Sequence, residues 1–142
     1  MGITMYCQKT KTSYDLGCIG FMHLRKKVAM LCNEEFGKHY ETITTAPLSE
    51  PNRDMFFQEF DKRTMQLIAE KKISPKIVDF CLQSDIEGRI HYGACKMIYE
   101  RIKNHDDNIR YGYSGQPDCF MFSDFKGLLK ECIDNKCDLV WR

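Results

Sequence analysis

Hydrophobic and polar residues alternate at both ends of the chain. Near the N-terminus Ile3, Met5 and Cys7 alternate with more polar residues, and Leu139 and Trp141 show the same spacing near the C-terminus. A period of two residues is typical of a strand with one buried face. We therefore predict a short strand at each end and expect the two strands to pair in a small antiparallel sheet.

Between these ends, apolar residues recur at helical spacing in five segments, residues 20–36, 56–68, 75–81, 95–102 and 125–132. Gly37 is the predicted stop of the first helix, and Asn135 that of the last. Ser74 is a predicted N-cap that is followed by Pro75 at the first helical position, and Ser123 is a second predicted N-cap. The pattern predicts about five helices with a little sheet, an α+β fold that is mainly helical.

The segment QSDIEGRIHYGA (83–94) has the outline of a calcium-binding EF-hand loop, with alternating acids, a glycine sixth and an aliphatic residue eighth. The EF-hand pattern requires an oxygen ligand at position 1 and a bidentate carboxylate at position 12. Here these positions hold Gln83 and Ala94, and Asp85 and Glu87 alone leave the ion short of ligands. We predict an EF-hand-like helix–loop–helix without bound calcium.

Composition narrows the class of protein. A chain of 142 residues with 43% hydrophobic content has the size of one domain, which we expect to span residues 1–142. The net charge of +1 gives no general attraction to duplex nucleic acid or to an anionic membrane. No apolar run is long enough for a signal peptide or a membrane span, so we expect a cytoplasmic protein.

The cysteines are numerous but scattered, at positions 7, 18, 32, 81, 95, 119, 132 and 137. No C-x-x-C motif occurs, and the closest pair, Cys132 and Cys137, has no second matching pair of the kind that zinc sites use. We predict that the cysteines are reduced, buried and free of metal, each taking the place of a small hydrophobic residue. The sequence indicates no cofactor.

The segment YDLGCIGFMHLRKK (14–27) is the first candidate ligand site. Asp15 and the glycines Gly17 and Gly20 lead into a helix whose free N–H groups and positive dipole end favour a phosphate or a carboxylate. Arg25 would add a charge-assisted hydrogen bond. The spacing matches neither common nucleotide-binding glycine motif, and a capped helix start is the alternative interpretation.

The loop RYGYSGQPDCFMF (110–122) is the second candidate. Arg110, Tyr111 and Tyr113 lie among glycines that would let the loop close over a ligand. Tyrosine rings and an arginine plane are typical of sites that stack on a base. The alternative is a wide turn whose tyrosines pack on the core.

The pieces DLGCIGFMHLRKKVA, SDIEGRIHYGACKMIYERI, DDNIRYGYSGQPDC and FSDFKGLLKECIDNKC, with the closing LVW, cover most of the chain. Together they resemble a group of small uncharacterised proteins of phages and prophages in Gram-positive bacteria. The resemblance implies a protein of the host-cell cytoplasm and brings no established activity. Phage proteins of similar size sequester nucleotide signals made by bacterial immune systems.

The function could be that of an enzyme, a ligand-binding sponge or a protein-binding inhibitor. No Ser-His-Asp or Cys-His signature appears and the four histidines are scattered, so we expect no enzyme. The favoured hypothesis is a phage sponge that sequesters a small anionic, nucleotide-derived immune signal, with a homodimer enclosing the ligand. The alternative is a protein-binding inhibitor or adaptor that uses an apolar helix face. Its candidate contacts, which core packing also explains, are Phe56, Phe57, Met65 and Met97.

Overall fold

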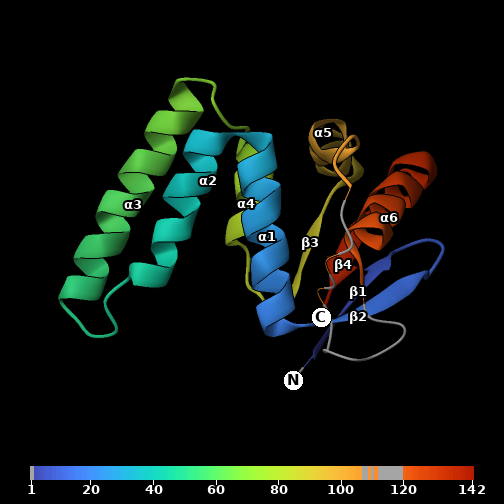
Figure 1. Cartoon of the computed structure of the whole chain (residues 1–142), viewed down its shortest axis with the longest axis horizontal. Coiled ribbons are helices and arrows are strands. Elements are labelled where there is room, and N and C mark those ends of the chain that lie inside the picture. The colour runs from blue at the N-terminus through green and yellow to red at the C-terminus, as the bar shows by residue number, and fades with distance from the viewer. Residues whose placement is uncertain (1, 107–108, 110, 112–119) are drawn as a thin grey trace.

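The computed structural model describes residues 2–106, 109, 111 and 120–142. These residues form six α-helices, one 3-10 helix and four strands (Figure 1). The elements follow in the order β1 (Gly2–Cys7), β2 (Ser13–Gly17), α1 (Cys18–Cys32), α2 (Glu34–Glu41), η1 (Thr42–Thr45), α3 (Asn52–Ala69), α4 (Pro75–Leu82), β3 (Gly88–Ile90), α5 (Tyr92–Ile102), α6 (Phe122–Asn135) and β4 (Leu139–Trp141). The mainly helical α+β class is confirmed.

The four strands form one antiparallel sheet in the order β2-β1-β4-β3. The predicted pairing of the chain ends is confirmed, because β1 and β4 are neighbours and Cys7 lies opposite Leu139. Ile3, Met5 and Cys7 are buried in alternation with more exposed residues, as the period of two predicts. The two ends of the chain therefore meet in the middle of the sheet.

The first predicted helix is wrong in its extent. The backbone at Asn33 is extended, with φ −164° and ψ 123°, and divides the segment into α1 and α2. The Asn33 side chain then caps α2 by accepting a hydrogen bond from the Phe36 N–H at 2.9 Å. Gly37 lies inside α2, where an added Cβ would come 2.6 Å from the Met30 Cα, so this glycine permits close packing of α2 on α1. Residues 39–45, which lie between the first two predicted helices, are helical as well.

The other predicted helix ends need smaller changes. Ser74 caps α4 and Pro75 occupies its first turn, as predicted. Helix α6 begins one residue before Ser123, and the Asp124 carboxylate, rather than the Ser123 hydroxyl, accepts a hydrogen bond at its start, from the Met121 N–H at 2.9 Å. The left-handed residue that follows α6 is Lys136, with φ 50°, and not Asn135.

Trp141 joins the sheet to the helices. It is fully buried and makes edge-on contacts with Phe21 of α1 and Phe80 of α4 at 5.4 and 5.7 Å between ring centroids.

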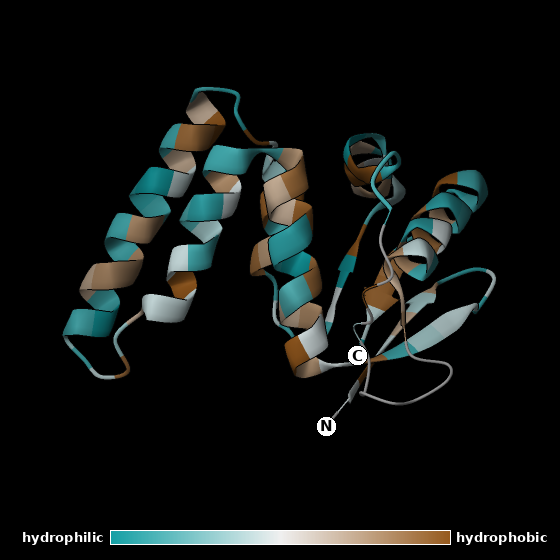
Figure 2. Cartoon of the chain, viewed as in Figure 1, coloured by the Kyte–Doolittle hydropathy of each residue, from teal (hydrophilic) through white to brown (hydrophobic). Residues whose placement is uncertain are grey.

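Helix α3, by contrast, lies at the edge of the molecule and packs on α2 (Figure 1). Much of its surface is hydrophilic (Figure 2). Among the described residues, no helix is both long enough and apolar enough to cross a bilayer.

Candidate functional site

A pocket of about 540 Å³ lies where α1 meets the C-terminal end of α4. We call it the Arg25 pocket. It is lined by Cys18, Ile19, Met22, Arg25, Tyr40, Ile43, Arg53, Cys81, Leu82, Gln83, Ser84 and Asp85. Its walls are mostly apolar, and two arginines contribute positive charge, a combination that suits a small amphipathic anion.

Arg25 is the buried cation of this pocket. Its side chain is only 5% exposed, and its guanidinium lies 4.2 Å from the centre of the Phe21 ring and 5.5 Å from that of Trp141. One nitrogen, Nη2, donates to the Ser84 carbonyl at 3.2 Å. The Nε is buried and has no hydrogen-bond partner among the described residues. The guanidinium therefore retains hydrogen-bonding capacity in a desolvated place.

No carboxylate balances the charge of Arg25 directly within the described part of the chain. Asp85, the acid that lines the pocket, is exposed and forms no ion pair with it there. Burial lowers the pKa of Arg25, and Tyr40, Cys81 and Asp85 oppose that change only in part. A buried charge without a close counter-ion is costly, so an anion that entered the pocket would find a strong partner.

Tyr40 and Arg53 complete the polar side of the pocket. The Tyr40 hydroxyl donates to the Cys81 carbonyl at 3.1 Å and lies close to Arg25. Burial, followed by the neighbouring Cys81, raises the pKa of Tyr40 to about 12, so the phenol stays neutral. Arg53 is exposed and donates to the Pro47 carbonyl at 3.1 Å. It places a second positive charge at the rim.

The predicted phosphate site at the start of α1 is occupied by the protein itself. The Gly17 N–H donates to the Tyr111 carbonyl at 3.3 Å. A Cβ at Gly20 would lie 1.6 Å from that same oxygen, so Gly20 is needed for chain packing. Asp15 is exposed on β2, where it accepts a hydrogen bond from the Thr4 hydroxyl at 2.8 Å. These residues and Arg25 do not converge on one ligand site.

The structure places the Tyr111 side chain in the core. Its side chain is 2% exposed and lies among core residues, with Phe122 at 6.4 Å between ring centroids and the Lys27 Nζ at 5.5 Å from its ring centre. The alternative interpretation, a tyrosine packed on the core, fits this position, because a buried ring offers no face to a base. Arg110 and Tyr113 lie outside the described residues.

The Gln83 side-chain amide bridges the EF-hand-like segment. The Gln83 side chain donates to the Arg89 carbonyl at 2.7 Å and accepts from the Arg89 N–H at 3.0 Å. The segment joins α4 to α5 and contains the short strand β3. Its acids, Asp85 and Glu87, belong to no group of three or more metal-ligand side chains in the described part of the chain. The absence of calcium binding stays a prediction.

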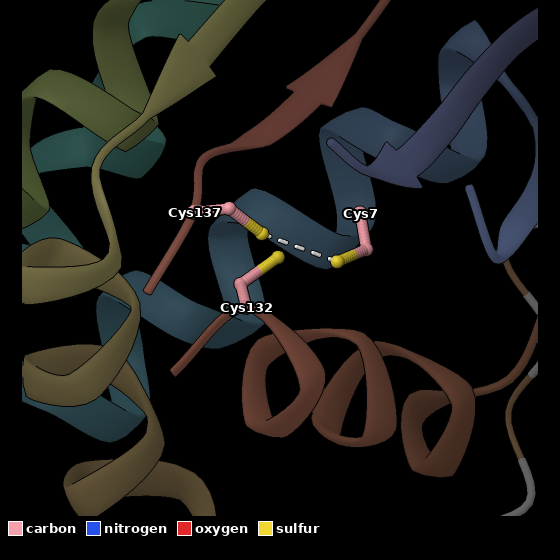
Figure 3. Close-up of side chains that lie close together, drawn as sticks. All are labelled: Cys7, Cys132 and Cys137. Carbon is pink, nitrogen blue, oxygen red and sulfur yellow. Dashed lines mark hydrogen bonds between the residues drawn. The ribbon is translucent and has the colours of Figure 1, made fainter. Parts of the chain in front are cut away.

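Cys7, from the start of the chain, lies together with Cys132 and Cys137, from its end (Figure 3). The sulfur atoms of Cys7, Cys132 and Cys137 all lie within 4.8 Å of one another, and those of Cys7 and Cys137 are 3.3 Å apart. All three side chains are buried. A hydrogen bond with Cys95 of α5, followed by burial, raises the pKa of Cys132.

Sequence reasoning missed Tyr40, Arg53 and Ser84 as pocket residues, because they come from three separate segments. One local signal was available for the pocket. Arg25 follows Phe21 by four residues and precedes Val28 by three, so it lies on the apolar stripe of α1, where a charged residue requires an explanation.

Comparison with known proteins adds no relative to this description. No protein-family model matches the chain, and neither the curated proteins nor the solved structures contain a significant match.

Proposed function

We propose that this protein is a non-enzymatic sponge that binds and sequesters a small anionic ligand of the nucleotide class in the Arg25 pocket. In this proposal a phosphate of the ligand binds the guanidinium of Arg25, and Arg53 at the rim supplies a second positive charge. The base lies on the apolar side chains of Ile19 and Met22, which are 71% and 37% exposed. The site differs from the glycine-led helix start that the sequence suggested.

The observation that carries the proposal is the environment of Arg25. A guanidinium that is 95% buried, faces a pocket and has an unbonded Nε would gain more from an anion than an exposed arginine would. The further identification of the ligand as a bacterial immune signal, and of the protein as a phage product that counters host defence, has the sequence resemblance as its support.

Ligand release tests the proposal. The protein is incubated with panels of cyclic and ADP-ribose-type nucleotides, freed of unbound ligand, denatured, and the released nucleotides are identified. We expect at least one to bind with a Kd below about 10 μM, to be recovered unchanged and to raise the melting temperature. Gel filtration with and without that ligand tests whether a homodimer encloses it. If no nucleotide in the panels binds this tightly, the sponge proposal fails.

Matched variants locate the site. Arg25→Met retains the aliphatic stem and should weaken binding about ten- to a hundredfold, as expected for the loss of a charge-assisted hydrogen bond. Because Arg25 is buried, Arg53→Ala provides a second variant at an exposed position of the same pocket, and we expect it to weaken binding less. Arg101→Ala, at an exposed position of α5, is the control and should bind like the parent. Unchanged affinity in both pocket variants would show that the ligand does not bind in the Arg25 pocket.

A protein-binding inhibitor or adaptor is the second candidate, and the surface of α3 favours it. Only Phe60, Thr64 and Leu67 of this 18-residue helix are buried. Met55 and Met65 are 61% and 63% exposed, and Leu48 in the preceding segment is 95% exposed. Exposed methionines are common on surfaces that adapt to a partner. Under this alternative, Met55→Lys together with Met65→Lys would abolish binding of the partner protein, whereas Arg53→Ala would preserve it.

A further inference from the structure

The three buried thiols of Figure 3 come from the two ends of the chain, which the fold brings together. Cys7 ends β1, Cys132 lies in the last turn of α6, and Cys137 lies in the connection from α6 to β4. The three side chains are at most 7% exposed, so any ion among them would be enclosed by protein.

The spacing of the sulfur atoms is close to that of a thiolate metal site. Zinc binds cysteine sulfur at about 2.3 Å in tetrahedral geometry, which places the sulfur atoms roughly 3.8 Å apart. Here the Cys7 and Cys137 sulfur atoms are 3.3 Å apart and all three sulfur atoms lie within 4.8 Å of one another. Side-chain rotations that shift each sulfur atom by about 1 Å or less would bring the three sulfur atoms to this spacing.

The chain folds back directly after Cys7. The Lys11 N–H donates to the Cys7 carbonyl at 2.9 Å, and Lys11 takes a left-handed φ of 63°. This turn fixes the end of β1, where the Cys7 sulfur lies 3.3 Å from that of Cys137.

We propose that Cys7, Cys132 and Cys137 bind one zinc-class divalent ion that ties β1 to the end of α6 and to the α6–β4 connection. Each thiol gives its proton to the solvent as the thiolate binds the ion, with no change of oxidation state. The burial of all three ligands leaves no access for a substrate, which makes this a structural site, not a catalytic one. The proposal replaces our sequence-based prediction that the cysteines are free of metal, and it is independent of the Arg25 pocket.

Metal analysis of the whole chain tests the proposal. The protein is purified under reducing conditions, given one equivalent of Zn²⁺ and passed through a desalting column. We expect one zinc per chain, a higher melting temperature than that of the metal-free protein, and, with Co²⁺ in place of Zn²⁺, the visible absorption of a tetrahedral thiolate complex. Retention of less than about a tenth of an equivalent of zinc would overturn the proposal. So would a Cys7–Cys137 disulfide in the reduced preparation, seen as a loss of about two hydrogens in the intact mass.

Serine variants identify the ligands. Cys137 is the most exposed of the three side chains, so Cys137→Ser disturbs packing least, and it should weaken zinc binding at least about tenfold. Cys18→Ser, at a half-buried cysteine outside the cluster, is the control and should bind zinc like the parent. Equal zinc binding by the Cys137→Ser variant and the parent would contradict the proposed ligand set.

Discussion

Arg25 takes a position that the helical period of α1 assigns to an apolar residue. Its guanidinium rests on aromatic rings and on the Ser84 carbonyl, an acceptor that also takes a hydrogen bond from the Trp141 Nε1–H at 3.0 Å. Cation–π contacts and one carbonyl offset only part of the cost of desolvating a guanidinium. This incompletely compensated guanidinium is the observation on which the proposed anion site rests.

The start of α1 depends on the absence of a side chain at Gly20. We expect Gly20→Ala to lower the free energy of unfolding by about 1–3 kcal/mol, because the new Cβ would overlap the Tyr111 carbonyl. Gly17→Ala is the matched control, since nothing lies within 4 Å of a Cβ there and its φ of −75° is ordinary, so its cost should stay below about 1 kcal/mol. Urea unfolding of both variants measures the difference. Equal costs would show that the segment carrying Tyr111 can move away.

His39 should make stability depend on pH. Its Nε2 lies 2.8 Å from the Thr64 hydroxyl, its ring stacks on Phe60 at 4.1 Å, and burial lowers its pKa. The folded state therefore favours neutral His39, and the unfolded state binds more protons once the pH falls below about 6.5. Stability should be fully present above that pH and should decline as the pH falls toward the lower folded-state pKa.

Urea unfolding between pH 5 and 8 checks this dependence on His39. We expect His39→Gln to be less stable at neutral pH but to lose less stability on acidification than the parent. His23→Gln, at an exposed position of α1, should follow the parent curve. A His39→Gln curve parallel to that of the parent would assign the pH dependence to other groups.

At the level of elements, the connection between α4 and α5 depends on a single side chain. The Gln83 amide satisfies both the N–H and the carbonyl of Arg89, so it fixes the turn that carries β3 to the edge of the sheet. We expect Gln83→Ala to cost about 1–2 kcal/mol, the net value of two hydrogen bonds. Gln58→Ala, at an exposed position of α3, should cost less than about 0.5 kcal/mol. Similar losses in the two variants, measured by urea unfolding, would show that the turn holds without the amide.

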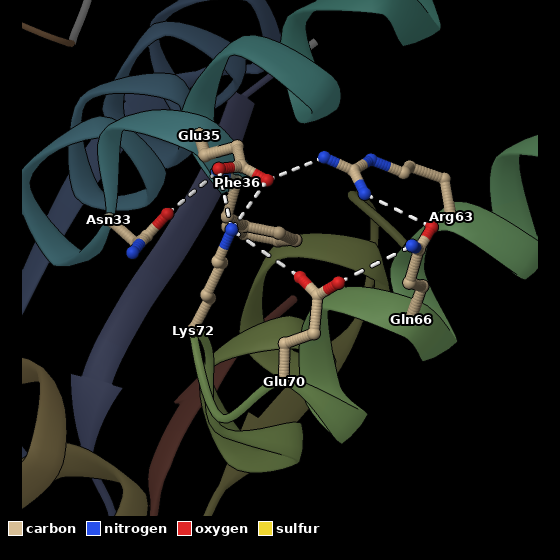
Figure 4. Close-up of polar contacts among 7 residues, drawn as sticks. All are labelled: Asn33, Glu35, Phe36, Arg63, Gln66, Glu70 and Lys72. Atoms are coloured by element: carbon tan, nitrogen blue, oxygen red, sulfur yellow. Dashed lines mark hydrogen bonds and ion pairs between the residues drawn. The ribbon is translucent and has the colours of Figure 1, made fainter.

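A polar network fixes the end of α3 to the start of α2 (Figure 4). Glu35 forms ion pairs with Arg63 and with Lys72, the latter at 2.9 Å, and these partners lower its pKa, the hydrogen bond from Lys72 most. Its side chain is 43% exposed, so salt should screen most of the interaction. The stabilisation is present above the ordinary pKa of Glu and is lost as the pH falls through the lower folded-state pKa.

The effect of salt on the variants tests this network. We expect Glu35→Gln to destabilise the protein slightly in low salt at pH 7 and to match the parent in 1 M NaCl. Glu34→Gln removes only the exposed pair with Lys38 and should be nearly neutral in both conditions. A loss from Glu35→Gln that persists in high salt would indicate that packing, and not charge, holds α3 in place.

For the whole molecule, Trp141 connects parts of the chain that are distant in sequence. It ends β4, packs on Phe21 and Phe80, and leaves no space for a side chain at Gly88, where a Cβ would come 2.4 Å from its ring. We expect Trp141→Ala to cost about 3–5 kcal/mol and to disturb the Arg25 pocket as well. Val140→Ala, at a half-buried position of the same strand, should cost about 1 kcal/mol. Thermal unfolding measures the loss of stability, and ligand binding measures the effect on the pocket. A Trp141→Ala variant that binds the ligand with full affinity would show that the pocket does not depend on this packing.

The sequence by itself determined the two terminal strands and most of the helices, but not β2, β3 or the separate helix α2. Amphipathic periods are local, so the strands at both ends, the start of α4 at Ser74 and the existence of the later helices could be predicted from neighbouring residues. The break at Asn33 was missed, because the apolar period continues through it. The close packing of Gly37 on Met30 is a contact between two helices, so no local sequence pattern predicts it.

Only the tertiary structure decided which side chains meet. Arg25 was recognisable as a candidate, but its partners Tyr40 and Ser84 come from other elements, and no spacing rule links them. From the sequence, Tyr111 could either stack on a ligand or pack on the core. In the structure its ring lies under the Lys27 amine and its backbone against Gly20, as expected for a core residue. Cys7 and Cys137 are 130 residues apart, and their sulfur atoms approach because the chain ends pair in the sheet. Contacts of this kind depend on the packing of the whole chain, which a local pattern does not encode.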